Sequence, residues 1–143
     1  MSAARILVVD DNPTNLKLVS EVLEFEGYEI LKAVDAEEAQ RIIEQHRPEI
    51  VLIDIALPGM DGLTLTRKLK AEEKTKDLVI VALTAFAMKG DEQKARDVGC
   101  DGYITKPIDT RALPALVESV RRSGARGQRS GSLEAEPLAK SSA

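Results

Sequence analysis

The sequence predicts a doubly wound α/β domain, in which a five-stranded parallel sheet carries five helices on its two faces. Short apolar segments alternate five times with longer amphipathic segments, and this alternation with short connections is typical of βαβ units. Residues 6–9 and 50–53 are apolar at every position, which predicts strands buried on both faces. Helices are therefore expected on both sides of the sheet.

The first half of the chain contains residues that typically begin and end helices. After the strand at residues 6–9, Asn12 and Pro13 favour a helix start, because asparagine caps a first turn and proline fits within it. The apolar period of this helix ends at Gly27, and residues 29–33 form a weaker second strand.

The capping-box spacing of Asp35 and Glu38 predicts a second helix that runs to about Gln45. A third strand at residues 50–54 is followed by a loop at 57–62. A helical pattern then begins at Leu63, residues 79–83 form a fourth strand, and a polar helix at 88–98 closes at Gly99. The last predicted elements are a short strand at 103–105 and a helix at 109–122.

Composition restricts the function classes. Residues 121–143 hold five of the 20 basic residues but only two of the 24 acidic ones, so the preceding residues are strongly acidic and do not suit a phosphate backbone. No apolar stretch approaches the ~20 residues of a membrane span, and no signal segment fits ahead of the first strand. We therefore expect a cytoplasmic protein without nucleic-acid binding or membrane insertion.

The chain is long enough for one independently folding domain. We expect this domain to span residues 1–122. Residues 123–143, rich in Ser, Gly, Ala and Arg, are expected to form a disordered polar tail. Cys100 is the only cysteine, so no intrachain disulfide is possible, and we expect an inert thiol in a reducing compartment.

Polar residues stand where the predicted strands end. Asp10 and Asp11 follow the first strand, and Asp54 ends the third, so the three carboxylates should meet at the carboxyl edge of the sheet. Their repulsion would raise at least one pKa unless a cation lay between them, and Mg²⁺ prefers such oxygen ligands. Thr84 and Lys106 end the fourth and fifth strands and suit a phosphoryl group. The simpler alternatives are that Asp10 and Asp11 cap the first helix, and that Thr84 and Lys106 are ordinary polar residues at the surface.

Five short motifs at these strand ends resemble the receiver domain of response regulators: Val9-Asp10-Asp11-Asn12, Asp54, Leu57-Pro58-Gly59-Met60-Asp61-Gly62, Leu83-Thr84-Ala85 and Tyr103-Ile104-Thr105-Lys106-Pro107. The resemblance covers residues 4 to about 122. Residues 84–92 with Gly99-Cys100 are most similar to stand-alone regulators of the DivK type. The resemblance implies a flavodoxin-like sheet with strand order 2-1-3-4-5.

The resemblance also implies roles for the acidic residues. Asp54 is expected to be the phosphoacceptor, which takes its phosphoryl group from a phosphohistidine. Asp11 and Asp54 would bind Mg²⁺ directly, together with the backbone carbonyl of Ala56, and Asp10 would hold the metal through water.

The remaining roles concern the response to phosphorylation. Lys106 would contact the phosphoryl group, and its bond to Pro107 is cis in the family. Thr84 would move toward the phosphoryl oxygen and Tyr103 would turn inward with it, which reshapes the face made by the fourth helix, fifth strand and fifth helix. Phe86 is expected to restrict attacking water and so to prolong the phosphorylated state.

The sequence thus predicts a phosphorylation-dependent switch of a two-component phosphorelay, and not an enzyme in the usual sense. The expected partners are a histidine kinase or histidine phosphotransfer protein as donor and a downstream protein effector. No output domain is expected, and the protein would be a monomer or weak dimer. The alternatives are a phosphorylation-independent scaffold and a haloacid-dehalogenase-type phosphatase, although Ala56 stands where the latter needs a second acid.

Overall fold

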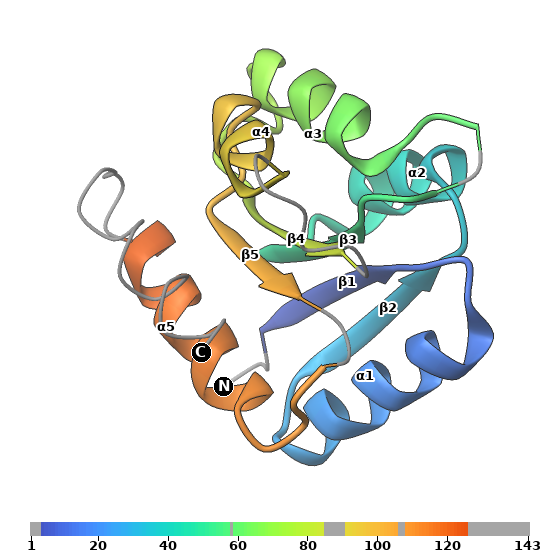
Figure 1. The fold of residues 1–143 in the computed structure, drawn as a ribbon, viewed down its shortest axis with the longest axis vertical. Coiled ribbons are helices and arrows are strands. Elements are labelled where there is room, and N and C mark those ends of the chain that lie inside the picture. Colours follow the sequence, from blue (N-terminus) through green and yellow to red (C-terminus); the bar gives the residue numbers. More distant parts are fainter. Residues whose placement is uncertain (1–3, 58, 85–90, 106–107, 126–143) are drawn as a thin grey trace.

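The computed structural model describes residues 4–57, 59–84, 91–105 and 108–125, and it confirms the predicted α/β architecture (Figure 1). All the strands are parallel and lie in the order β2-β1-β3-β4-β5, which is the flavodoxin-like order. The elements in these residues are β1 Arg5–Val9, α1 Pro13–Phe25, β2 Glu29–Ala33, α2 Ala36–His46, β3 Ile50–Asp54, α3 Gly62–Ala71, β4 Val79–Thr84, α4 Asp91–Asp97, β5 Gly102–Thr105 and α5 Leu113–Ala125.

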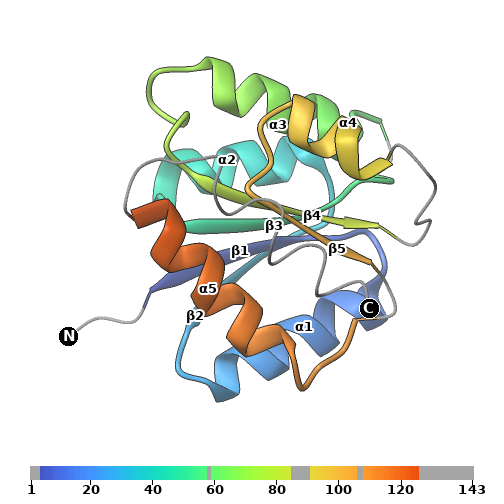
Figure 2. The same cartoon turned by 60° about the vertical axis from the view of Figure 1, so that its left-hand side comes forward.

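Helices cover both faces of the sheet, with α1 and α5 on one side and α2, α3 and α4 on the other (Figure 2). Successive side chains of a strand point to opposite faces, so Ile6 and Val8 pack with α1 and α5, while Leu7 and Val9 pack with α2 and α3. All four side chains are fully buried. Each stabilises the fold by about 1.5–3 kcal/mol relative to an exposed position, which explains the continuous apolar runs of the central strands.

The predicted helix caps are present. The Asn12 side chain accepts hydrogen bonds from the backbone N–H groups of Thr14 and Asn15, at 2.9 and 3.1 Å. The Asp35 carboxylate accepts from the Glu38 N–H at 2.9 Å, and the Glu38 carboxylate accepts from the Val34 N–H at 2.9 Å. The bonds from the Thr14, Asn15 and Glu38 N–H groups satisfy donors that the first turn of a helix leaves without intrahelical partners, and the bond from Val34 holds the residue just before the cap of α2.

The last helix differs from its prediction at both ends, because it spans Leu113–Ala125 and not 109–122. The Asp109 carboxylate accepts hydrogen bonds from the N–H groups of Arg111 and Ala112, at 3.0 and 3.3 Å. This side chain stabilises a turn that leads directly into the helix, since the Leu113 N–H also donates to the Asp109 carbonyl at 3.0 Å. The fourth helix, α4, is described from Asp91 onward. Its predicted start at Met88 lies outside the residues that the structure describes.

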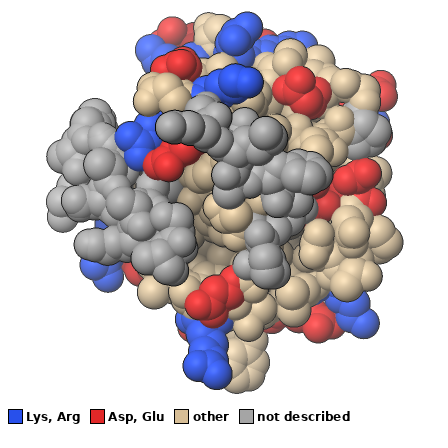
Figure 3. Space-filling view, in the orientation of Figure 1, with Lys and Arg blue, Asp and Glu red and all other residues tan. Residues whose placement is uncertain are grey.

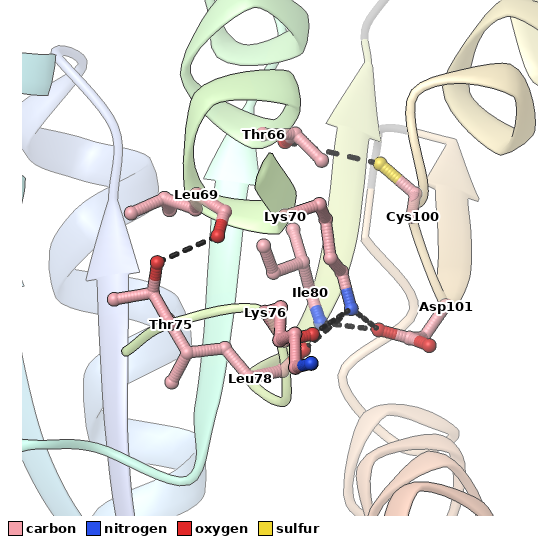
Figure 4. A network of polar contacts seen from close by, with 9 residues as sticks. All are labelled: Thr66, Leu69, Lys70, Thr75, Lys76, Leu78, Ile80, Cys100 and Asp101. Atoms are coloured by element: carbon pink, nitrogen blue, oxygen red, sulfur yellow. Dashed lines mark hydrogen bonds and ion pairs between the residues drawn. The ribbon is translucent and has the colours of Figure 1, made fainter. Parts of the chain in front are cut away.

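A polar network joins α3 to the segments that enter β4 and β5 (Figure 4). The Lys70 ammonium donates to the carbonyl of Leu78 at 2.7 Å and to the Asp101 carboxylate at 3.1 Å. The same Asp101 oxygen accepts from the Ile80 N–H at 2.9 Å. Lys70 and Asp101 therefore fasten the α4–β5 turn to the end of α3, at the edge of the sheet opposite to the ends of β1 and β3.

Candidate functional site

Three carboxylates meet at the carboxyl edge of the sheet, as the sequence predicts. Asp10 and Asp11 follow β1, and Asp54 is the last residue of β3, which is the neighbour of β1 in the sheet. One carboxylate oxygen from each of the three lies within 4.8 Å of the others. Asp10 and Asp54 are 1% and 5% exposed, whereas Asp11 is exposed. The cluster thus combines two buried carboxylates with one that is exposed to solvent.

Each of the two buried acids is oriented by its own backbone. The Asp10 carboxylate accepts a hydrogen bond from the Asn12 N–H at 2.9 Å, and the Asp54 carboxylate accepts one from the Ala56 N–H at 3.0 Å. Both bonds span two residues, which is the geometry of an Asx turn. The sequence analysis missed these turns, although the tendency of aspartate to bond the N–H two residues on is a signal that can find them.

Thr84 lies on the next strand, at the same edge. In the register of β3 and β4, Asp54 is paired with Leu83, so Thr84 is one residue further along than the phosphoacceptor candidate. Its side chain is 4% exposed, and its backbone is paired with Thr105 at the end of β5. The structure therefore brings the hydroxyl candidate to the edge that the sequence predicts.

Tyr103 belongs to β5 and its ring is buried. It is 7% exposed and packs in a small cluster with Ala82 of β4 and Ala95 of α4. The aromatic ring thus lies between the sheet and α4, inside the face that the resemblance assigns to signal output. Lys106, Pro107 and Phe86, which the sequence analysis also selected, lie outside the described residues.

Oxygen ligands in this arrangement suit a hard divalent cation. Mg²⁺ favours one or two carboxylates, further oxygens and retained water, and three acidic side chains at this spacing can supply that set. Two of the acids are buried, so a cation between them offsets repulsion that water screens poorly. The donor set therefore fits the magnesium that the sequence predicts.

Cys100 lies away from this cluster, between α4 and β5. Its side chain is partly buried, and its sulfur is 4.0 Å from the Thr66 hydroxyl oxygen. Burial, which penalises the charged thiolate, raises the pKa of Cys100 to about 12. The thiol is therefore protonated at neutral pH, in keeping with the expected inert cysteine.

Comparisons with known proteins agree with this architecture. The family model of the response regulator receiver domain matches residues 6–118 of this chain. The polar-differentiation response regulator DivK of Brucella anthropi is 39% identical over 116 residues, covering 81% of this chain and 92% of that protein. A putative response regulator from Chloroflexus aurantiacus J-10-fl superposes with a TM-score of 0.81 at 30% identity, covering 85% of this chain and 99% of the other. A CheY-like response regulator receiver domain protein from Methanospirillum hungatei JF-1 superposes with a TM-score of 0.80 at 31% identity, covering 89% of this chain and 100% of the other.

An acidic cluster at the carboxyl edge of a 2-1-3-4-5 sheet, together with these matches, defines a receiver-type signalling domain. The chain belongs to the response regulator receiver domain family of two-component systems, and it is similar to DivK regulators. Both the family and the fold that the sequence predicts are thereby confirmed.

Proposed function

We propose that this protein is a phosphorylation-dependent switch, with Asp54 as the residue that accepts the phosphoryl group. The observation that carries the proposal is the convergence of the Asp10, Asp11 and Asp54 carboxylates within 4.8 Å at the carboxyl edge of the sheet. In a receiver domain, this edge is where an aspartate accepts phosphate from a histidine kinase or a histidine phosphotransfer protein.

The acceptor chemistry needs one nucleophile and a means of balancing charge. A carboxylate oxygen of Asp54 forms a bond to phosphorus as the bond from phosphorus to the donor imidazole nitrogen breaks, and that nitrogen keeps the electron pair. The Asn12 and Ala56 N–H groups hold the two buried carboxylates in place, so little reorganisation is needed. Asp10, Asp11, Asp54 and the carbonyl of Ala56 would hold Mg²⁺, whose charge stabilises the transferred phosphoryl oxygens.

The output is a change in partner binding. Thr84 stands at the site and Tyr103 stands on β5 beneath α4, so the two residues link the carboxyl edge to the face formed by α4, β5 and α5. Lys106 completes the charge balance at the phosphoryl group. Phosphorylation draws the Thr84 hydroxyl toward the phosphoryl oxygens and alters the packing of Tyr103, and a downstream protein reads the new face.

The surface suits protein partners. On the face shown in Figure 3, basic and acidic side chains of the described residues are interspersed, which does not favour a nucleic-acid backbone. Among the described residues, no helix is both long and apolar enough to cross a bilayer. A phosphohistidine donor and a protein effector in the cytoplasm are the partners that fit these features and the family.

Phosphoryl transfer can be tested with a small donor. We expect the protein to gain the mass of one phosphoryl group when it is incubated with acetyl phosphate and Mg²⁺, as measured by intact mass spectrometry. Asp54→Asn should gain none, because an amide is not a nucleophile of this kind, and Asp77→Asn, which changes an exposed acid away from the site, should behave as wild type. A wild-type protein that stays unmodified, or equal gain in Asp54→Asn, would contradict the proposal.

Partner binding separates the switch from a scaffold. A pull-down with and without a beryllofluoride mimic of the phosphoryl group should recover different amounts of effector from the wild type and equal amounts from Asp54→Asn. Partner recovery that does not depend on the mimic would support the phosphorylation-independent scaffold instead.

A further inference from the structure

Gly62, the first residue of α3, touches the backbone of the phosphoacceptor candidate. A Cβ atom at this position would lie 2.4 Å from the Asp54 carbonyl oxygen, 2.9 Å from the Ile55 Cα and 2.7 Å from the Ile53 Cγ2. Two of these three neighbours are backbone atoms of the strand end, which cannot rotate away as the tip of a side chain can. Glycine is therefore required here by space, because α3 begins directly against β3.

Hydrogen bonds hold this contact in place from both sides. The Gly62 N–H donates to the Ile55 carbonyl at 2.9 Å. The Gly62 carbonyl accepts from the buried Thr66 hydroxyl at 2.8 Å, and the Asp61 side chain caps the helix by accepting from the Thr64 N–H at 2.8 Å. The first turn of α3 is thus fixed to the residues that immediately follow the acceptor.

The segment that Gly62 abuts is the one that sets the acceptor geometry. Asp54 supplies the carboxylate, and the Ala56 N–H orients that carboxylate at 3.0 Å. A methyl group on residue 62 must push α3 away from β3 or shift residues 54–56, because the added Cβ would overlap the backbone atoms of Asp54 and Ile55. Either change moves the Asp54 carboxylate relative to Asp10 and Asp11, which are anchored on β1.

We propose that Gly62 is a positioning residue for phosphoryl acceptance, which sets the place of the Asp54 carboxylate through direct contact with the backbone of residues 54–55. The inference rests on the proposed function of Asp54. Since a displacement of about 1 Å can lower the rate of a reaction on the order of 100-fold, the loss should exceed what a general loss of stability produces.

The test compares Gly62→Ala with a variant that removes only one of the clashes. Leucine has no Cγ2 branch on its Cβ, so Ile53→Leu relieves the side-chain contact at 2.7 Å but leaves the Asp54 carbonyl contact at 2.4 Å. Leu69→Val weakens the core packing of the same helix at its far end and serves as the stability control. The readouts are the rate of phosphorylation by acetyl phosphate with Mg²⁺, the thermal midpoint, and the amide NMR shifts of residues 54–56.

Gly62→Ala is expected to phosphorylate on the order of 10- to 100-fold more slowly and to shift the amides of residues 54–56. The double variant Gly62→Ala/Ile53→Leu should phosphorylate as slowly as Gly62→Ala, because the contacts with the backbone of residues 54 and 55 remain. Leu69→Val should lose thermal stability with little loss of rate. The inference is overturned if Gly62→Ala keeps the wild-type rate, if Leu69→Val reproduces the loss of rate, or if the double variant recovers the wild-type rate.

Two further outcomes remain decisive. If Gly62→Ala does not fold, Thr66→Val replaces it, because valine keeps the shape of threonine and removes the hydrogen bond to the Gly62 carbonyl, together with the weak contact to the Cys100 sulfur. Unchanged amide shifts at residues 54–56 in Thr66→Val would then overturn the inference. If the wild type accepts no phosphoryl group, the proposed function fails, and the amide shifts of Gly62→Ala decide alone whether Gly62 sets the position of Asp54.

Discussion

At the scale of single residues, the Cys100 thiol and the Tyr28 phenol make the stability of this protein depend on pH in the alkaline range. Burial raises the pKa of Cys100 to about 12 from its ordinary value of 9.0. Burial, and then the hydrogen bond at 2.8 Å to the Glu118 carboxylate, raise the pKa of Tyr28 to about 12 from 10.0. The folded protein therefore keeps two protons at pH values where the unfolded chain has lost them.

The sign of the pH effect follows from this difference. Between pH 9 and 12 the unfolded state binds fewer protons than the folded state, so the free energy of unfolding falls as pH rises. We expect this stabilisation to be fully present at pH 7.5 and to decline progressively above about pH 9, as measured by urea denaturation at a series of pH values.

Two variants identify the groups responsible. Tyr28→Phe and Cys100→Ala each remove one of the titrating protons, so the decline above pH 9 should be shallower in each and shallowest in the double variant. An equally steep decline in the double variant would show that other groups control the alkaline response.

At the scale of elements, the junction of α3 with the α4–β5 turn depends on one partly buried cation, the Lys70 ammonium. Lys70→Met keeps most of the apolar stem but removes the donor to the Leu78 carbonyl and the Asp101 carboxylate (Figure 4). Because a partly buried carboxylate and a carbonyl then lose a charged partner, we expect the free energy of unfolding to fall by about 1–3 kcal/mol. The amide of Ile80, which donates to Asp101, should also exchange faster with deuterated solvent.

A matched control lies six residues further along. Lys76 pairs with Glu73 at 3.1 Å, but both side chains are largely exposed, so Lys76→Met should change the free energy of unfolding by no more than about 0.5 kcal/mol. Equal losses in Lys70→Met and Lys76→Met would mean that the polar network of Figure 4 contributes nothing specific.

The starts of the helices show where two local hydrogen-bonding patterns, the helix cap and the turn, compete for the same side chain. Asn12 and Asp35 cap helices as predicted, because their side chains bond to the first turns of the helices that follow. Asp109 makes similar side-chain bonds to Arg111 and Ala112, but these residues form a turn, and α5 begins only after it, at Leu113. An aspartate favours a helix cap and a turn through similar hydrogen bonds, so sequence alone does not choose between them.

At the scale of the whole molecule, magnesium should stabilise the fold as well as the site. The proposed ligands Asp10, Asp11 and Asp54 lie at the ends of two strands that meet only in the folded protein, so we expect Mg²⁺ to bind the native state preferentially. At a free concentration of about 100 times the dissociation constant, binding contributes about 2.7 kcal/mol, and the thermal midpoint should rise.

Thermal unfolding with Mg²⁺ and with a chelator checks this expectation. The shift should be small or absent in Asp54→Ala and as large as in the wild type in Asp77→Asn, whose acid is exposed on the loop before β4. A full shift in Asp54→Ala would place the stabilising metal elsewhere on the molecule.

The alternation of strands and helices, the buried faces of the sheet and the aspartates at its edge can all be predicted from local patterns in the sequence. Apolar runs such as 50–53 can be satisfied only by burial on both faces, and a polar residue that ends such a run must emerge where the strand ends. These signals are local, so the sequence predicts that Asp10, Asp11, Asp54 and Thr84 lie at the carboxyl edge of the sheet.

Contacts between residues that are distant in the sequence depend on the folded arrangement of the elements. Gly62 reads in the sequence as part of a loop motif, but its contact with the Asp54 carbonyl depends on how closely α3 approaches β3. The bond between Lys70 and Asp101 likewise joins residues 31 positions apart. Close packing distances between elements are set by the whole core and carry no local sequence signal, so these contacts became visible only in the folded molecule.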